Sequence, residues 1–431
     1  MQQGGNATRP RSGRRARTGV AAAALALLAL AACTSGSSTP GNPVLPTGGG
    51  STTDAPDTSA SSTPPSDPAV ITAFRGTAVS PVKPITVSIE NGTLTDVTML
   101  NPEGKHVRGE IDADGTSWHN TEVLGYSKAY RIKAMGVGED GTQVVKRSRL
   151  TTLTPSNMTM PYLDDIYGSS LQDGGTYGVG MVVRVHFDEI VDERKAEKAF
   201  QVTTSPSVEG GWFWQDSTNA YWRPKDYYEP GTEVTINANV YGKDVGQGLY
   251  GQADQSVSFK IGQKRVAIAD NKTHRVKVYF DDKLVRNMPT SMGMGGSTTG
   301  DNGQTIYFWT MPGTYTVINH ENPAIMSSSS YGLPENSPYG YAPEKVPYAT
   351  KISTDGIYLH ELDATVWAQG HQNVSHGCLN LNYANAKWYY NHSHIGDVVQ
   401  VIHSAGPKIN FNQGGQWSIP WKQWLQGSAL N

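Results

Sequence analysis

The sequence predicts a mainly β protein: two β-sandwich domains in series, then a third mainly β domain with one short helix and an aromatic C-terminal tail. Three observations support this fold class. Short segments of alternating apolar and polar residues recur along the chain, turn residues interrupt them every few positions, and long helical patterns are scarce. Glycine is abundant, at 47 of 431 residues, and 21 Tyr and 10 Trp accompany it, which suits strands joined by tight turns.

Residues 1–33 predict an export signal. Arginines from Arg9 to Arg17 precede an apolar run, residues 20–32, that is too short to cross a bilayer as a mature helix. The run ends in Leu30-Ala-Ala-Cys33, which resembles a bacterial lipobox, so we expect Cys33 to be lipidated and to anchor the protein to the membrane. An ordinary signal peptide cut at a nearby alanine is the alternative, and the residues around the Arg14-Arg15 pair fit a twin-arginine signal poorly.

Residues 34–68 predict a flexible tether. They are mostly Ser, Thr, Pro, Gly and Asp, so they cannot bury enough apolar surface to offset chain entropy. Such a tether gives an anchored protein reach into a surrounding polymer.

Two immunoglobulin-like sandwiches are expected at residues 69–155 and 156–262. The first has strand patterns at 85–89 and 130–134 with an Asn91-Gly92 turn signal, and the second has them at 182–187 and 234–240. Trp212, Trp214 and Trp222 lie near strand positions of the second block, and we expect them in its core rather than on a sugar-binding platform.

The third domain, residues 263–404, should begin with a hairpin at 264–269 and 275–280 and continue with strands at 313–318 and 356–359. Asn382 is a good N-cap for a helix over 383–390, Gly396-Asp397 stops it, and 398–401 predicts a closing strand. The tail, residues 405–431, carries Trp417, Trp421 and Trp424 and is expected to pack on the third domain.

Charge and cysteine count narrow the function. The formal net charge of −3 argues against a nucleic-acid partner. Of the two cysteines, Cys33 is used by the anchor or removed with the signal, so Cys378 is a lone thiol with no internal disulfide partner. A lone thiol in an oxidising compartment is a liability unless it has a function.

The residues around Cys378 indicate nucleophilic catalysis. A histidine near the sulfur can take its proton, and we expect a thiolate–imidazolium pair in which the thiol pKa is lowered by roughly two units or more. His360, at the end of a neighbouring strand, is favoured as the base over His376, which lies only two residues from Cys378 and is expected to be structural. Gly377 allows a tight turn that aims the N–H groups of Gly377 and Cys378 at one point, which would form an oxyanion hole.

His360 together with the segment Ser375-His376-Gly377-Cys378-Leu379-Asn380 resembles the signature of L,D-transpeptidases with a YkuD-type catalytic domain. The wider sequence, from Trp222-Arg-Pro-Lys225 to Trp417-Ser-Ile-Pro-Trp421, resembles the mycobacterial and actinobacterial branch. The resemblance implies that Cys378 is the acyl-enzyme nucleophile, His360 its general base, and the Glu361 carbonyl the group that orients the imidazole. Close relatives usually carry Ser at the position of Glu361, and a carboxylate there could instead raise the pKa of His360.

The resemblance also implies the remaining site residues. The oxyanion segment and its support are Ser375, His376, Gly377 and Asn380. The substrate contacts are those same Ser375 and Asn380 together with residues of a mobile lid, namely Met326, Tyr331, Gly332 and Tyr341.

By this resemblance the donor is a peptidoglycan tetrapeptide stem. The enzyme would attack the carbonyl of diaminopimelate, release D-Ala and pass the acyl group to the diaminopimelate amine of a second stem. Neither metal nor cofactor is required, carbapenems are expected to acylate Cys378, and the protein is expected at the outer face of the cytoplasmic membrane, reaching into the cell wall.

Three alternatives remain open from the sequence. One is an L,D-carboxypeptidase or endopeptidase on the same stems, and another is a non-enzymatic wall-binding lipoprotein. The third is a metal site, although the spacing of His360, His371, His376 and Cys378 matches no regular zinc pattern.

Overall fold

The computed structural model describes residues 67–431; Cys33, the predicted export signal and nearly all of the predicted tether lie outside this range. Within residues 67–431, no helix is both long enough and apolar enough to span a membrane. The described chain is mainly β, which confirms the predicted fold class.

Two four-stranded sheets form the first domain, in the orders β1-β3-β6-β5 and β2-β8-β7-β4. Their apolar faces enclose one core that includes Trp118 and Ile132. Asn91, with a φ of 55°, separates β3 from β4, and because these strands belong to different sheets the predicted Asn91-Gly92 turn is a corner between sheets. The strands are β1 (Val70–Ala73), β2 (Gly76–Val79), β3 (Thr86–Glu90), β4 (Gly92–Leu100), β5 (Gly109–Ile111), β6 (Ser117–Asn120), β7 (Ala129–Gly138) and β8 (Gln143–Thr152).

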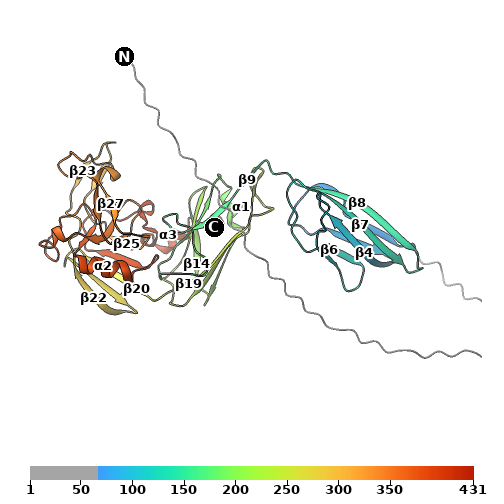
Figure 1. Cartoon of the computed structure of the whole chain (residues 1–431), viewed down its shortest axis with the longest axis horizontal. Coiled ribbons are helices and arrows are strands. Elements are labelled where there is room, and N and C mark those ends of the chain that lie inside the picture. Colours follow the sequence, from blue (N-terminus) through green and yellow to red (C-terminus); the bar gives the residue numbers. More distant parts are fainter. Residues whose placement is uncertain (1–66) are drawn as a thin grey trace, which may run out of the picture. The chain divides into compact units, whose positions relative to one another are not determined.

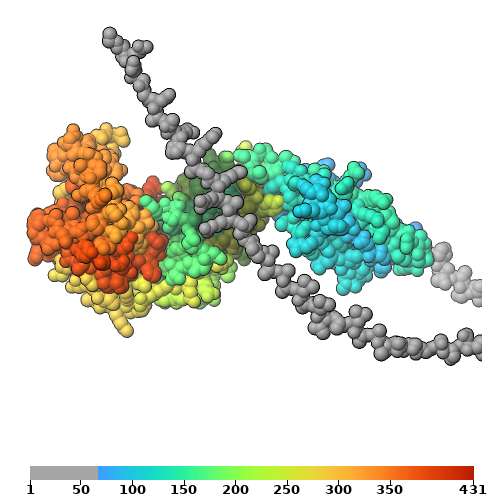
Figure 2. Space-filling model, viewed as in Figure 1, coloured from blue at the N-terminus to red at the C-terminus, as the bar shows by residue number. Residues whose placement is uncertain are grey.

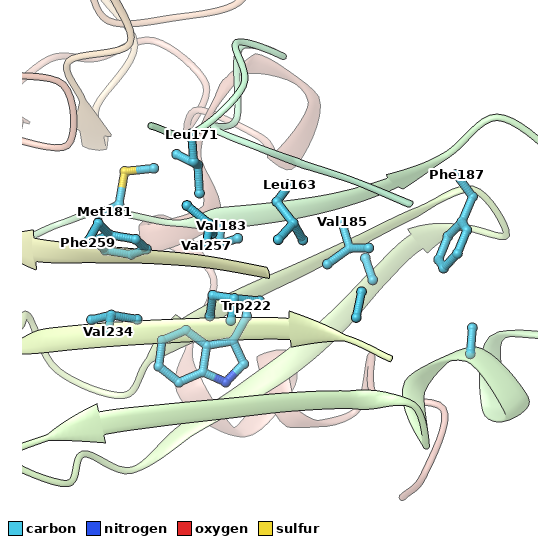
Figure 3. Packing of buried hydrophobic residues seen from close by; sticks show 14 of the residues in the cluster. Leu163, Leu171, Met181, Val183, Val185, Phe187, Trp222, Val234, Val257 and Phe259 are labelled. Carbon is cyan, nitrogen blue, oxygen red and sulfur yellow. The ribbon is translucent and has the colours of Figure 1, made fainter. Parts of the chain in front are cut away.

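The second domain is also built from two four-stranded sheets, in the orders β10-β12-β15-β14 and β11-β19-β16-β13, with a small sheet β17-β18-β9. Figure 3 shows Trp222 and Phe187 among the apolar side chains between the sheets. Trp214 and Trp222 are buried and Trp212 packs against the same core, which confirms their predicted structural role. The elements are β9 (Asn157–Thr159), β10 (Pro161–Asp164), β11 (Gly175–Tyr177), β12 (Val183–Phe187), α1 (Glu193–Glu197), β13 (Phe200–Ser205), β14 (Gly210–Asp216), β15 (Asn219–Pro224), β16 (Glu233–Ala238), β17 (Asp244–Gly246), β18 (Leu249–Gly251) and β19 (Gln255–Ile261).

A five-stranded sheet, β22-β21-β20-β32-β25, and a four-stranded sheet, β26-β29-β30-β31, share the core of the third domain. The strands are β20 (Arg265–Asp270), β21 (Arg275–Phe280), β22 (Lys283–Pro289), β23 (Ser297–Thr299), β24 (Thr305–Tyr307), β25 (Gly313–Thr316), β26 (Asn319–Glu321), β27 (Ala324–Met326), β28 (Glu344–Val346), β29 (Ala349–Lys351), β30 (Tyr358–Glu361), β31 (Leu379–Leu381) and β32 (Val398–Ile402). The helical segments are η1 (Ser328–Tyr331), η2 (Asp363–Thr365), α2 (Tyr383–His392), η3 (Phe411–Gln413), η4 (Gln416–Ser418) and α3 (Trp421–Leu425). Figure 1 labels β20, β22, β25 and α2.

Helix α2 begins where the sequence predicts it. The Asn382 side chain accepts a hydrogen bond from the Asn385 N–H at 2.9 Å, which satisfies one of the free donors of the first turn. The helix packs against β29 and β30, the strands next to the predicted nucleophile. The short helix after Cys378 is thereby confirmed.

The C-terminal tail contacts the second domain as well as the third, whereas the sequence predicted contact with the third domain. The Trp417 indole N–H donates to the Gly180 carbonyl at 2.7 Å, and the Trp424 indole N–H donates to the Gly211 carbonyl at 2.9 Å. On the third domain the tail accepts a hydrogen bond from the Thr314 N–H through Ser418 Oγ at 2.8 Å. Since Trp424 is fully buried, the tail joins the cores of two domains rather than covering one.

Candidate active site

Two parallel strands position the site. In β30 and β31, Leu359 pairs with Leu379 and His360 with Asn380. Cys378 directly precedes β31, so strand alternation brings His360 and Cys378 to the same face, diagonally across the pair. Cys378 packs against a small apolar cluster that includes Tyr358, the residue two positions before His360 on β30.

The imidazole of His360 is buried and held by one backbone contact. Its Nδ1 lies 2.8 Å from the Glu361 carbonyl oxygen, so Nδ1 carries the proton and Nε2 is the basic nitrogen. This is the orienting contact that the resemblance implies. The Glu361 carboxylate points elsewhere and accepts the Asp363 N–H at 2.7 Å, so the unusual side chain at this position does not act on the imidazole.

The thiol and the imidazole are both desolvated. Burial raises the pKa of the Cys378 thiol to about 11 and lowers the pKa of His360 to about 4. The resting groups are therefore neutral near pH 7, contrary to the predicted thiolate–imidazolium pair. The physical reason is burial, which disfavours the charged form of each group; the Glu361 carbonyl that accepts from His360 raises the pKa of the imidazole and so offsets only part of this effect. Cys378 Sγ lies 3.5 Å from the Gly356 carbonyl oxygen.

One side chain stabilises the loop before the cysteine. Ser375 Oγ donates to the Cys378 carbonyl at 2.6 Å and accepts the Gly377 N–H at 3.1 Å. The Gly377 N–H is thus engaged within the loop, which corrects its expected place in an oxyanion hole. The Gly377 carbonyl accepts a hydrogen bond from Thr310 Oγ1 at 2.7 Å, a buried support that the sequence analysis did not identify.

Asn380 and Ser375 do not line the pocket, so their expected role as substrate contacts is not supported. Asn380 is buried, and its backbone forms two hydrogen bonds with Ser291. Its N–H donates to the Ser291 carbonyl at 2.9 Å, and its carbonyl accepts the Ser291 N–H at 3.1 Å. Both residues therefore support the loop from behind.

The thiol opens onto a cavity of about 760 Å³. One wall is the lid, which we define as residues 324–346, comprising β27, η1 and β28. This region is orange in Figure 2 and projects from the surface of the third domain. Met326, Tyr331 and Tyr341 line the cavity as expected, whereas Gly332 does not line it but ends η1 with a φ of 84°.

His376 packs against the lid. Its ring stacks on Tyr341 at a centroid distance of 5.5 Å and meets the edge of Phe308 at 5.2 Å. Burial lowers the pKa of His376, so the ring is neutral near pH 7. The structural role expected for this histidine takes the form of aromatic packing between the catalytic loop and the lid.

A buried lysine lines the same cavity. Lys351 is 8% exposed, and its Nζ lies 3.1 Å from the Tyr167 hydroxyl and 4.5 Å from the centre of that ring. No carboxylate among residues 67–431 pairs with this ammonium group. Lys351 was not predicted from the sequence, although a lysine at the end of β29, directly before the buried Ile352, was a usable signal.

Potential metal ligands do not gather in this region. Within the described residues, no group of three or more His, Cys, Asp or Glu side chains is arranged to hold an ion.

Fold and site define a class of β proteins in which a cysteine at the start of a buried parallel strand faces a pocket, with a histidine on the adjacent strand. A family model described as the L,D-transpeptidase catalytic domain matches residues 264–401, and one described as a bacterial Ig domain matches residues 76–244.

Relatives with similar sequences agree with these matches. L,D-transpeptidase 2 of Mycobacterium tuberculosis (strain CDC 1551 / Oshkosh) is 39% identical over 348 residues, which cover 80% of this chain and 81% of that protein. L,D-transpeptidase 5 of Mycobacterium tuberculosis (strain ATCC 25618 / H37Rv) is 33% identical over 359 residues, covering 82% and 74%. A solved L,D-transpeptidase in complex with imipenem is 27% identical, with a TM-score of 0.46, covering 56% of this chain and 99% of that one. The chain belongs to the L,D-transpeptidase family.

Proposed function

We propose that this L,D-transpeptidase cross-links peptidoglycan stem peptides through a thioester at Cys378, with His360 as general base. The observation that carries the proposal is a pocket-facing thiol directly before β31 and, on the paired strand β30, a buried imidazole whose Nδ1 donates to the Glu361 carbonyl. That hydrogen bond leaves Nε2 free to take a proton.

Acylation begins from the neutral pair. The thiol turns away from the Gly356 carbonyl, its proton passes to His360 Nε2, and Sγ attacks the carbonyl carbon of the donor's third residue, diaminopimelate. The negative charge moves to the carbonyl oxygen, for which the Cys378 N–H is the donor remaining from the expected pair. Collapse of the intermediate breaks the amide bond, and the imidazolium gives its proton to the departing nitrogen of D-Ala.

The second half-reaction reverses the roles. The side-chain amine of a diaminopimelate on another stem attacks the thioester carbonyl and passes a proton to His360. The sulfur departs and is protonated again, so a peptide bond joins the third residues of the two stems. Water must be kept from the thioester during this step, and the lid with its Tyr331 and Tyr341 rings is placed to exclude it.

Lys351 gives the pocket a feature that suits this substrate. Stem peptides carry several carboxylates, and a buried ammonium group without a carboxylate partner favours a negatively charged ligand. We assign Lys351 the recognition of one donor carboxylate, with Tyr167 holding the ammonium group in place.

Carbapenems should react at the same atom, because their strained lactam carbonyl is an acyl donor for a thiol that has a base nearby. Intact-protein mass spectrometry after incubation with imipenem tests the nucleophile: we expect one adduct on the unmodified protein and none on the Cys378→Ala variant. An adduct of equal yield on Cys378→Ala would refute the assignment.

Product analysis tests the acceptor. With a disaccharide tetrapeptide as the only substrate, we expect a dimer joined between diaminopimelate residues together with free D-Ala. Monomeric tripeptide as the sole product would instead indicate a carboxypeptidase, and activity that survives Cys378→Ala would contradict the cysteine mechanism.

Membrane anchoring is a further part of the proposal, and it is supported by Leu30-Ala-Ala-Cys33 at the end of the apolar run. The lipid would hold the enzyme at the outer face of the cytoplasmic membrane, with residues 34–68 as the tether. Expression with radiolabelled palmitate should label the unmodified protein and leave Cys33→Ala unlabelled; labelling of both proteins would refute the site.

A further inference from the structure

The outer face of the sheet β2-β8-β7-β4 in the first domain carries a basic groove, in a different domain from Cys378. The groove has a volume of about 810 Å³, and Figure 1 labels the strands β4, β7 and β8 that form most of it. Five basic residues line it: Arg75, Arg131, Lys133, Arg147 and Arg149. We call this surface the basic groove.

Strand pairing sets like charges against one another. In the antiparallel pair of β7 and β8, Arg131 lies directly opposite Arg149, and Lys133 lies directly opposite Arg147. Two adjacent cross-strand positions on one face are thus occupied by four cations. Like charges directly opposite one another destabilise a sheet, so this arrangement lowers the free energy of unfolding. A bound anion would offset the repulsion.

The protein does not supply that compensation within residues 67–431. None of the five basic residues forms an ion pair there, whereas Arg108 and Lys128 of the same domain pair with Glu122 and Glu103. Strand β4 carries one acidic residue, Asp96. It lies opposite Met135 of β7 and accepts a hydrogen bond from Thr98.

The geometry suits a linear polyanion. Residues two apart on a strand are separated by roughly 7 Å, so Arg131 and Lys133, and likewise Arg149 and Arg147, form two parallel rows of cations at about that repeat. Arginine forks match phosphate oxygens bidentately. No aromatic side chain lines the groove, which disfavours stacked bases, and its concave surface is a poor match for a flat bilayer.

We propose that the basic groove binds a phosphodiester polymer of the cell envelope and that this contact holds the first domain against the wall matrix. The inference is independent of the chemistry at Cys378. It predicts binding that weakens with salt, because each neutralised phosphate releases counterions.

Isothermal titration calorimetry of the full chain with a synthetic oligo(glycerol phosphate) tests the proposal. The Arg131→Gln/Arg149→Gln variant should bind about 10-fold more weakly at low salt, and its log–log salt slope should fall by roughly one to two. The matched control, Arg108→Gln/Lys128→Gln, removes the same charge from the same domain outside the groove and should change affinity less than about twofold. Without polymer, the groove variant should melt at a higher temperature than the unmodified protein, because one repulsive cross-strand pair is gone.

Several outcomes would overturn the proposal: no binding of the polymer, or equal losses in the groove and control variants. Tighter binding to phosphatidylglycerol vesicles than to the polymer, with the same dependence on the groove, would assign the surface to membrane docking instead. Displacement of the polymer by inorganic phosphate at an equal phosphate concentration would indicate a site for a single anion rather than for a chain.

Discussion

The neutral thiol–imidazole pair makes a sharp prediction about pH. Acylation of Cys378 by imipenem requires His360 in its neutral form, and burial holds its pKa at about 4. At pH 5.5 about 97% of such a histidine is neutral, against about 9% of a histidine with an ordinary pKa near 6.5. Between pH 7.5 and pH 5.5 the rate constant should therefore fall by less than about 10%, whereas a solvated histidine would lower it about 10-fold.

The assay is the second-order rate constant for loss of the free thiol, followed by intact mass from pH 5 to pH 8.5. The His360→Gln variant is the control, because a thiol with a pKa of about 11 and no base reacts only through its thiolate fraction, which rises about tenfold per pH unit in this range. A flat profile for the unmodified protein and a steep one for His360→Gln are expected. A rate constant that falls below a pH of about 6.5 would show that the base is solvated. A steep profile in both proteins would show that His360 does not act as the base.

Three further predictions concern substrate recognition and stability. Lys351→Met should raise the KM for a tetrapeptide donor about 10-fold or more with little change in kcat, because a hydrogen bond to a charged group contributes about 1.5–3 kcal/mol. An unchanged KM in steady-state assays would show that Lys351 does not recognise the substrate. Trp424→Ala should lower the free energy of unfolding by about 3–5 kcal/mol, because it empties a fully buried position and removes the indole N–H that donates to the Gly211 carbonyl. Urea titration measures this loss, and a change below about 1 kcal/mol would show that the tail is not part of the core. Gly178→Ala should lower the free energy of unfolding by about 1–3 kcal/mol, because the added Cβ meets the backbone of Gly396 and Asp397 where the second and third domains touch; calorimetry should show a lower melting temperature. Gly246→Ala, whose added Cβ makes only ordinary contacts at 3.5 Å or more, is the control and should change the melting temperature much less.

The secondary structure was largely predictable because its signals are local. The strand pattern at 275–280 coincides with β21 (Arg275–Phe280), and the cap at Asn382 begins α2 as expected. Asp281 and Asp282 both adopt positive φ, at 48° and 63°, and turn β21 into β22. Aspartate tolerates that conformation better than most residues, so this tight turn also depends on a local pair of residues.

The position of the tail was less predictable because the same aromatic residues could cover either domain. Sequence shows that Trp417, Trp421 and Trp424 need burial, but it does not show against what. In the structure they surround the Arg223 guanidinium of the second domain at 4.5–5.2 Å from their ring centres. That contact joins residues about 200 positions apart, and no local pattern encodes it.

In the candidate site, too, local features were predictable and contacts between distant segments were not. The sequence by itself predicted Cys378 and His360 as the reacting pair, because a lone thiol with a histidine at the end of a preceding strand has few other uses, and the family resemblance predicted the Glu361 carbonyl as the orienting group. Only the tertiary structure decided the ionisation of the pair, the closure of Ser375 Oγ onto the Gly377 N–H, and the placement of Lys351 beside Tyr167. These features depend on desolvation and on contacts between distant segments, whereas the residues that identify the chemistry lie within one short stretch and its neighbouring strand.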